Sequence, residues 1–170
     1  TMLISNINSE CGVLPGRITE VAMPHTNDET VALFTQLRGG QDLSDIPEYL
    51  RCPVIMDTGC GRSFATNKKM LKDIRSHRGM CTGANGRFAT DCIGTLHLPI
   101  NALPTTFVWK EPDVILHTTC SYVLLSPGRA SKEMGLSLNL DSYSDVATCS
   151  LPNGVVIPLV NRNVLMLRPL

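Results

Sequence analysis

The sequence predicts an all-β domain with one or two short helices, on three observations. Short apolar or alternating runs recur at close spacing along most of the chain, Asn-Gly dipeptides separate two pairs of these runs, and helical periodicity is confined to short segments. Many short strands joined by tight turns are typical of a barrel or a sandwich. The 170 residues suffice for one domain with a full hydrophobic core.

The first 29 residues differ in character from the rest of the chain. Residues 6–28 are polar, contain proline and glycine, and show no sustained period, so we predict an N-terminal arm or spacer over 1–29 and one domain over 30–170. Thr30–Leu37 is rich in β-branched and apolar residues, which predicts a strand that ends at Gly39-Gly40. Asp42–Tyr49 is predicted to form a turn or a short helix.

A short apolar run, Cys52–Met56, stops abruptly at Asp57-Thr58-Gly59. This pattern predicts a buried strand that delivers its last residue into a glycine turn. Farther along, Thr66-Asn67 is a candidate helix cap for the segment KKMLKDI, in which Met70, Leu71 and Ile74 share one helical face. We therefore expect a short helix there.

Asn-Gly turns predict two hairpins, because these residues adopt the positive φ values of a type I′ turn. The first hairpin joins Met80–Thr82 to Arg87–Ile93, with its tip at Ala84–Gly86. The second joins Ala147–Leu151 to Val155–Val160 through Asn153-Gly154. Further strands are predicted at Ile93–Ile100, Phe107–Trp109, Val114–His117, Tyr122–Leu125 and Leu136–Leu140.

A second helix is predicted at Arg129–Met134. It follows the turn Ser126-Pro127-Gly128, and Gly135 is suited to close it in the left-handed conformation.

Charge and hydropathy exclude several classes of partner. Lysine plus arginine equal aspartate plus glutamate at 15 each, so no net field attracts nucleic acid or an anionic membrane. Five basic residues gather between positions 68 and 78, which we interpret as a solvated helix face; they are Lys68, Lys69, Lys72, Arg75 and Arg78. No segment approaches the roughly 18 consecutive apolar residues of a membrane span, and Thr1–Ile7 lacks the features of a secretion signal. A soluble, cytoplasmic protein is expected.

Cysteine usage argues against a disulfide framework and against a closed zinc site. The seven cysteines are odd in number and irregularly spaced, and no two lie at CxxC spacing, so reduced thiols are expected. His117 with Cys120 is the nearest approach to a ligand pair, but a metal site needs three or four converging ligands. The remaining histidines, His25, His77 and His97, lack a nucleophile motif nearby.

The most informative feature is the carboxylate of Asp57 at the end of a buried strand. A carboxylate there loses solvation, so it requires hydrogen bonds, a partner charge or a raised pKa. Gly59 allows the backbone to bring an amide near the carboxylate, and the Thr58 hydroxyl is able to bond a neighbouring chain. The triplet alone fits equally a solvated turn in which Asp57 merely caps the strand end.

Four segments in order resemble the protease of copia-type retrotransposons, which is similar to the retroviral proteases known as retropepsins. They are VIMDTGCGRSFATN, ANGRFATDCIGTLHLPI, VILHTTCSYVLLS and NGVVIPLV, and the resemblance extends from Thr30 to about Val160. It implies a retropepsin-like acid-protease barrel in which each of two chains contributes one Asp-Ser/Thr-Gly turn to a shared cleft. The chain contains one such turn, so activity would require a homodimer with two-fold symmetry.

The resemblance also implies a mechanism. Two Asp57 carboxylates about 3 Å apart share one proton, and the ionised one takes a proton from water as the water attacks the peptide carbonyl. The protonated one stabilises the oxyanion and helps to protonate the leaving amine. No metal, other cofactor or covalent intermediate is required. The expected substrate is a polypeptide, in the first place the polyprotein of a retroelement, processed in the cytoplasm or inside a virus-like particle.

The roles of other residues follow from the same resemblance. Thr58 would hold the two turns together, and Gly59 and Gly61 would offer backbone groups to an extended substrate by strand addition. The flap tip would be Ala84, Asn85 and Gly86, closing over the substrate and excluding water. Leu124 is a candidate pocket residue, although a plain core position fits it equally well.

The chain departs from the family pattern in three places. Cys60 stands where the family usually has alanine or serine, and we interpret it as an inert small substitute. Leu124-Leu125 is followed by Ser126, with Gly128-Arg129 displaced by two positions, and residues 1–29 match nothing in the family. Two alternatives keep the fold: a catalytically silent dimerisation or peptide-binding module, and a related peptidase within a cellular adaptor protein. Nucleic-acid binding would need a basic aromatic face, which the sequence lacks.

Overall fold

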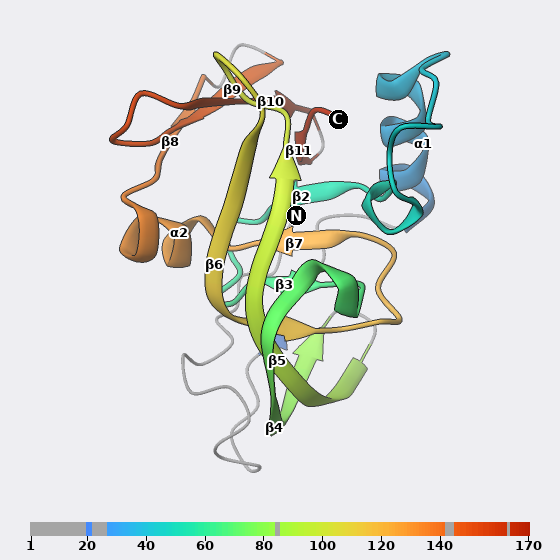
Figure 1. Ribbon diagram of the computed structural model, residues 1–170, viewed down its shortest axis with the longest axis vertical. Coiled ribbons are helices and arrows are strands. Elements are labelled where there is room, and N and C mark those ends of the chain that lie inside the picture. Colours follow the sequence, from blue (N-terminus) through green and yellow to red (C-terminus); the bar gives the residue numbers. More distant parts are fainter. Residues whose placement is uncertain (1–19, 22–26, 84–85, 142–144, 163) are drawn as a thin grey trace.

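The computed structural model describes residues 20–21, 27–83, 86–141, 145–162 and 164–170. Within these residues the chain is mostly β with two short α-helices, which confirms the predicted all-β class. All the described strands belong to one mixed sheet in the order β1-β4-β5-β6-β3-β7-β2-β11-β10-β9-β8 (Figure 1). They are β1 (Glu20–Val21), β2 (Val54–Met56), β3 (Phe64–Ala65), β4 (Leu71–Gly83), β5 (Gly86–Ile100), β6 (Phe107–Leu116), β7 (Val123–Leu125), β8 (Ser137–Leu140), β9 (Val146–Ser150), β10 (Val156–Asn161) and β11 (Leu165–Leu167).

The middle of the sheet is built on β2, as predicted from the apolar run before Asp57. Strand β2 pairs in parallel with β7, so that Ile55 lies beside Leu124, and in antiparallel with β11, so that Ile55 also lies beside Met166. Strand β3 continues the sheet on the far side of β7 and joins it to β6. Because β2 and β7 are parallel, their carboxyl ends emerge at the same edge of the sheet.

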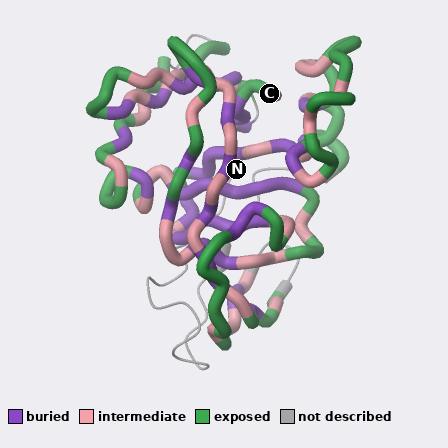
Figure 2. The backbone as a smooth tube through the Cα atoms, viewed as in Figure 1, coloured by how far each residue is buried: buried purple, intermediate pink, exposed green. Residues whose placement is uncertain are grey.

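Successive residues of these central strands alternate between two hydrophobic clusters. Ile55, Leu124 and Met166 belong to one cluster, whereas Met56 and Leu125 belong to the other. A strand that is buried on both faces has a continuous apolar sequence, which is why VIM and VLL lack alternation. The centre of the molecule is accordingly buried in Figure 2.

Both predicted hairpins are present. Strands β4 and β5 pair in antiparallel as far as Gly83 opposite Gly86, and β9 and β10 pair around Asn153-Gly154. The predicted flap-tip residues Ala84 and Asn85 lie outside the described residues. The two strands expected at Phe107–Trp109 and Val114–His117 form the single strand β6.

The strand predicted at Thr30–Leu37 is wrong, because this segment lies within helix α1 (Asn27–Arg38). Thr30 and Phe34 are buried, and Leu33 and Leu37 are half-buried. Their spacing of three and four residues places all four on one helical face, which overrides the β propensity of the segment. Asp28 and Glu29 in the first turn and Arg38 in the last also complement the helix dipole. The helix ends at Arg38, before Gly39 with φ +58°, which is where the sequence analysis had placed the end of a strand.

The helix predicted for KKMLKDI is also wrong beyond its first turn. Asn67 caps a 3-10 turn, η2 (Lys68–Met70), by accepting a hydrogen bond from the Lys69 amide at 2.9 Å. The chain then enters β4, where Leu71 pairs with Leu96 of β5. The basic residues therefore do not share a helix face, and Arg75 makes an ion pair with Asp113.

The predicted second helix is confirmed as α2 (Pro127–Met134). Gly135 closes it with φ +71°, and the Ser126 side chain caps its first turn. A 3-10 turn, η1 (Glu48–Leu50), overlaps the end of the segment predicted as a turn or short helix, Asp42–Tyr49. No helix of the described residues has the length and apolar content to cross a membrane.

Candidate active site

Asp57 begins the turn that follows β2. Its amide donates a hydrogen bond to the Leu125 carbonyl at 3.0 Å, which extends the pairing of β2 with β7 by one residue. Its carbonyl accepts from the Cys60 amide at 3.1 Å and closes the turn over Asp57–Cys60. The strand and the turn together hold a side chain that is only 2% exposed.

The two carboxylate oxygens of Asp57 have different surroundings. Oδ1 accepts the Gly59 backbone N–H at 2.8 Å, as the Asp-Thr-Gly pattern predicted. Oδ2 is buried and has no hydrogen-bond partner among the described residues. Burial raises the pKa of Asp57, and the Gly59 N–H offsets part of that rise by stabilising the charged form. The group therefore holds a proton to higher pH than a solvated aspartate, with one oxygen free for a further partner.

Thr58 is exposed, whereas Asp57 before it and Gly59 after it are buried. Gly61 is half-buried. The structure thus brings together Asp57, Thr58, Gly59 and Gly61 of the predicted site in one short turn. An exposed hydroxyl beside a buried carboxylate is suited to contact a second molecule.

The other predicted site residues lie elsewhere. Gly86 is the first residue of β5, and Ala84 and Asn85 lie outside the described residues. Leu124 is fully buried in β7, in the hydrophobic cluster with Ile55 and Phe64. The core interpretation of Leu124 therefore fits its surroundings in the single chain.

Two serines that the sequence analysis did not connect support the Asp57 turn. The Ser126 hydroxyl donates to the Cys60 carbonyl at 2.5 Å, and the Ser126 amide donates to the Ser63 hydroxyl oxygen at 3.0 Å. Ser126 and Ser63 are both buried. Since these contacts join residues more than sixty positions apart, no local pattern indicated them.

Glu111 is a second buried carboxyl group, close behind the two serines. Its Oε1 accepts the Trp109 indole N–H at 3.1 Å, and the Ser63 hydroxyl bonds its side chain as well. Burial raises the pKa of Glu111, and Ser63, Trp109, Arg129 and, last, Arg62 pull it down. The sequence contained a signal for the Trp109–Glu111 contact, because two residues that are two positions apart on a strand share one face of it.

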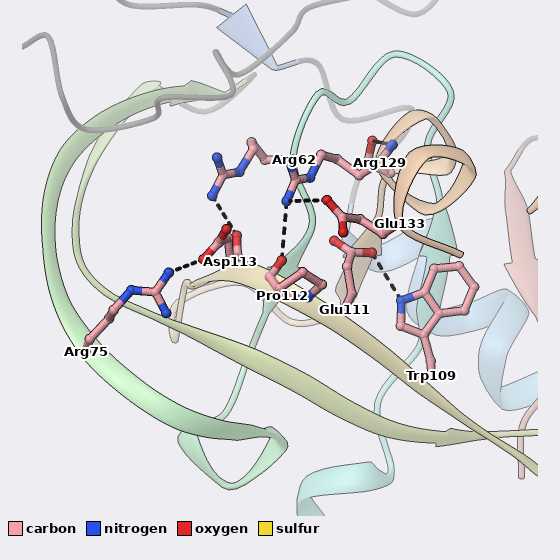
Figure 3. A network of polar contacts seen from close by, with 9 residues as sticks. Arg62, Arg75, Trp109, Glu111, Pro112, Asp113, Arg129 and Glu133 are labelled. Atoms are coloured by element: carbon pink, nitrogen blue, oxygen red, sulfur yellow. Dashed lines mark hydrogen bonds and ion pairs between the residues drawn. The ribbon is translucent and has the colours of Figure 1, made fainter. Parts of the chain in front are cut away.

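Arg129 and Arg62 act on this carboxyl group by their charge, and Arg75 lies farther away, beside Asp113 (Figure 3). Arg62 donates to the Asp113 carbonyl at 2.6 Å, and Arg129 approaches Glu133 at 3.6 Å. Arg75 pairs with the Asp113 side chain, whose residue has φ +58°. The cluster ties β6, α2 and the turn after Asp57 together by charge-assisted contacts.

His117 and Cys120 do not form a ligand set with other residues. The His117 ring stacks on Phe88 with centroids 3.8 Å apart, and the Cys120 thiol donates to the Tyr122 carbonyl at 3.2 Å. Within the described residues, no three His, Cys, Asp or Glu side chains gather in a way that would hold a metal ion.

Cys60 packs as a small buried side chain. It is 3% exposed, and its thiol donates to the Arg62 carbonyl at 2.7 Å. This environment fits the interpretation of Cys60 as an inert substitute for alanine or serine.

Comparison with known proteins adds no identity: no protein-family model matches the chain, and no curated protein matches it in sequence.

Proposed function

We propose that the chain is one subunit of a homodimeric aspartic endopeptidase with a retropepsin-like fold. The observation that carries the proposal is the carboxyl group of Asp57, which is buried at a strand end with Oδ1 held by Gly59 and Oδ2 without a partner. A buried, unpartnered carboxylate oxygen is costly unless it serves a function. Sharing a proton with a second Asp57 across a two-fold axis would satisfy it.

The proposed chemistry follows from the raised pKa of Asp57. Two such groups brought together titrate as a coupled pair, so that one is ionised and the other protonated over the working pH range. The ionised group removes a proton from the attacking water, and the protonated group donates to the carbonyl oxygen of the substrate. The carboxyl group that took the proton from water then passes it to the amine nitrogen as the C–N bond breaks, while the other carboxylate takes back a proton from a hydroxyl of the tetrahedral intermediate, which restores the pair without a metal ion.

The dimer is supported by two features of the turn. The sequence has a single Asp-Thr-Gly triplet, so we propose that the second carboxyl group comes from a second copy of the chain. Thr58 is exposed next to Asp57, where its hydroxyl is available to a second turn. A two-fold axis beside Thr58 would bring both Asp57 side chains to it.

The substrate is proposed to be an extended polypeptide. The resemblance to retroelement proteases suggests that backbone groups of Gly59 and Gly61 would bind an extended strand and that the β4–β5 hairpin would close over it. The resemblance to retroelement proteases suggests a polyprotein as the natural substrate.

A catalytically silent dimerisation or peptide-binding module is the second candidate. It is favoured by the burial of Asp57, which is 2% exposed in the single chain and so offers little surface to water or substrate. This candidate predicts a folded dimer that binds peptides without cleaving them.

The first experiment is a cleavage assay with an unfolded protein substrate at mildly acidic pH, beside Asp57→Asn at the same concentration. A dimeric aspartic protease cleaves with a rate that rises more steeply than linearly with enzyme concentration, and the variant is inactive. Absence of cleavage by a confirmed folded dimer favours the silent module. Equal cleavage by wild type and variant contradicts the role of Asp57.

A further inference from the structure

We propose that Ser126, acting with Ser63, is a positioning residue that fixes the Asp57 turn against β7 and the start of α2. The inference rests on the proposed function, and it assigns roles to two serines outside the Asp-Thr-Gly triplet. Neither serine is placed to react with a substrate; each acts through the backbone of the turn.

Ser126 contacts the segment after Asp57 through both its side-chain hydroxyl and its backbone amide. It is fully buried, its hydroxyl hydrogen goes to the Cys60 carbonyl at 2.5 Å, and its amide goes to the Ser63 oxygen at 3.0 Å. The hydroxyl oxygen also accepts the Arg129 amide at 3.3 Å, which caps α2. Because a carbonyl only accepts, the direction of the short Ser126–Cys60 bond is fixed.

Ser63 anchors this arrangement to β6. Its oxygen accepts from Ser126, so its own hydrogen is left for the carboxyl group of Glu111, which it bonds. Glu111 is held in turn by the Trp109 indole, and the pair lies on one side of β6 in Figure 3. A continuous path of buried hydrogen bonds therefore runs from Glu111 of β6 through Ser63 and Ser126 to the Cys60 carbonyl.

The path ends at the residue that closes the Asp57 turn. The Cys60 amide donates to the Asp57 carbonyl at 3.1 Å, while the Cys60 carbonyl is held by Ser126. The backbone of Cys60 is thus held on both sides, and with it the turn that carries the Asp57 carboxyl group. Misplacement of a reacting group by 1 Å is enough to cost roughly a hundredfold in rate.

The test separates positioning from the capping of α2. Ser126→Gly removes the hydroxyl, yet glycine is almost as good an N-cap as serine, so the helix is retained. Ser126→Thr restores a hydroxyl at the same place. Ser131→Ala changes an exposed serine in α2 and serves as the matched control.

In the peptide-cleavage assay, we expect Ser126→Gly to lower kcat about tenfold or more with KM changed less than about twofold. Ser126→Thr recovers most of the rate, and Ser131→Ala matches the wild type. Ser63→Ala lowers kcat similarly, and the double variant is no worse than either single one, because both break the same path.

An unchanged kcat for Ser126→Gly, at an unchanged folded fraction and dimer mass, overturns the inference. A fall in activity that only follows loss of folded protein, with no recovery by threonine, also overturns it.

A second readout does not depend on activity. The titration midpoint of the Asp57 carboxyl carbon, measured by NMR, should fall in Ser126→Gly because a loosened turn admits water, and should stay in place in Ser126→Thr. Tyr122, the residue before β7, interacts electrostatically with Asp57, so Tyr122→Phe is measured beside it to account for its contribution. An unmoved midpoint in Ser126→Gly overturns the inference. If the wild-type protein does not cleave the substrate, but the Asp57 midpoint is lower in Ser126→Gly than in the wild type, the proposed function is contradicted and the positioning role of Ser126 remains.

Discussion

Trp109 donates its indole N–H to Glu111, two residues farther along the same strand, at 3.1 Å, and both side chains are fully buried. Each side chain therefore helps to exclude water from the other, and the indole N–H is satisfied by the carboxyl group.

Replacing Glu111 with alanine should destabilise the protein by about 1–3 kcal/mol, since the Trp109 N–H loses its acceptor in a dry environment. Glu111→Gln keeps an acceptor oxygen and should cost less. Chemical denaturation measures both values. Glu133→Ala, in the partly exposed pair with Arg129, serves as the control and should change stability by less than about 0.5 kcal/mol. A loss of the same size in Glu111→Ala and Glu133→Ala contradicts the buried bond.

Asp57→Asn should stabilise the protein at neutral pH. The folded pKa of Asp57 lies above its ordinary value of 3.8, so the folded state binds the proton more tightly than the unfolded state does. The resulting stabilisation is complete below the ordinary value and is lost as pH rises through the folded pKa. Asparagine carries no charge, so its advantage over aspartate should be absent at low pH and should grow as pH rises.

Thermal unfolding between about pH 3 and pH 7 at one protein concentration checks this, and each kcal/mol corresponds to about 2–4 °C for a chain of this size. Asp45→Asn at an exposed turn is the matched control. An advantage of Asp57→Asn that is largest at low pH contradicts the burial of Asp57.

Helix α1 should be held to the sheet by Phe34. This side chain is 7% exposed and belongs to the hydrophobic cluster of Ile55 and Leu124. Phe34→Ala should cost about 3–5 kcal/mol, as truncation of a buried phenylalanine does. Val31 lies in the same helix but is 44% exposed, so Val31→Ala should change stability by less than about 0.5 kcal/mol. Urea titration measures both values, and equal losses of stability in the two variants contradict the packing of Phe34 against the sheet.

Gly94 allows β4 and β5 to approach closely at their register shift. A Cβ atom at Gly94 would lie 2.9 Å from the Lys72 carbonyl oxygen and 3.1 Å from the Leu71 Cβ, so backbone has to move. Gly94→Ala should therefore destabilise by about 1–3 kcal/mol. Gly40→Ala meets nothing within 4 Å and should be neutral or slightly stabilising. Similar stability of the two variants in guanidinium chloride would argue against the close contact.

The sequence predicted those elements whose determinants are local. Asn-Gly turns located both hairpins, Gly135 located the end of α2, and the abrupt stop after Met56 located Asp57. It misassigned α1, because the β-branched content of TVALFTQL was weighed above the spacing of its buried residues.

The support of the candidate site depends on long-range packing. Ser63, Glu111 and Ser126 come from three distant segments, and each has an ordinary local sequence. Only the pairing of β3, β6 and β7 brings them together. No periodicity or spacing in a single sequence shows that three such distant residues are in contact. The Asp-Thr-Gly triplet could therefore be found from the sequence, whereas the residues that support it could not.

The parallel pairing of β2 with β7 also has a kinetic consequence. Ile55 and Leu124 are neighbours in the sheet, yet β3, the β4–β5 hairpin and β6 all separate them along the chain. Closing so large a loop costs entropy before its contacts repay it, and folds dominated by distant pairings form slowly. The two hairpins can form early, because their strands are adjacent in the chain. The Asp57 amide acquires its hydrogen bond to the Leu125 carbonyl only when β7 pairs with β2. The candidate active site should therefore be among the last parts of the molecule to mature during folding.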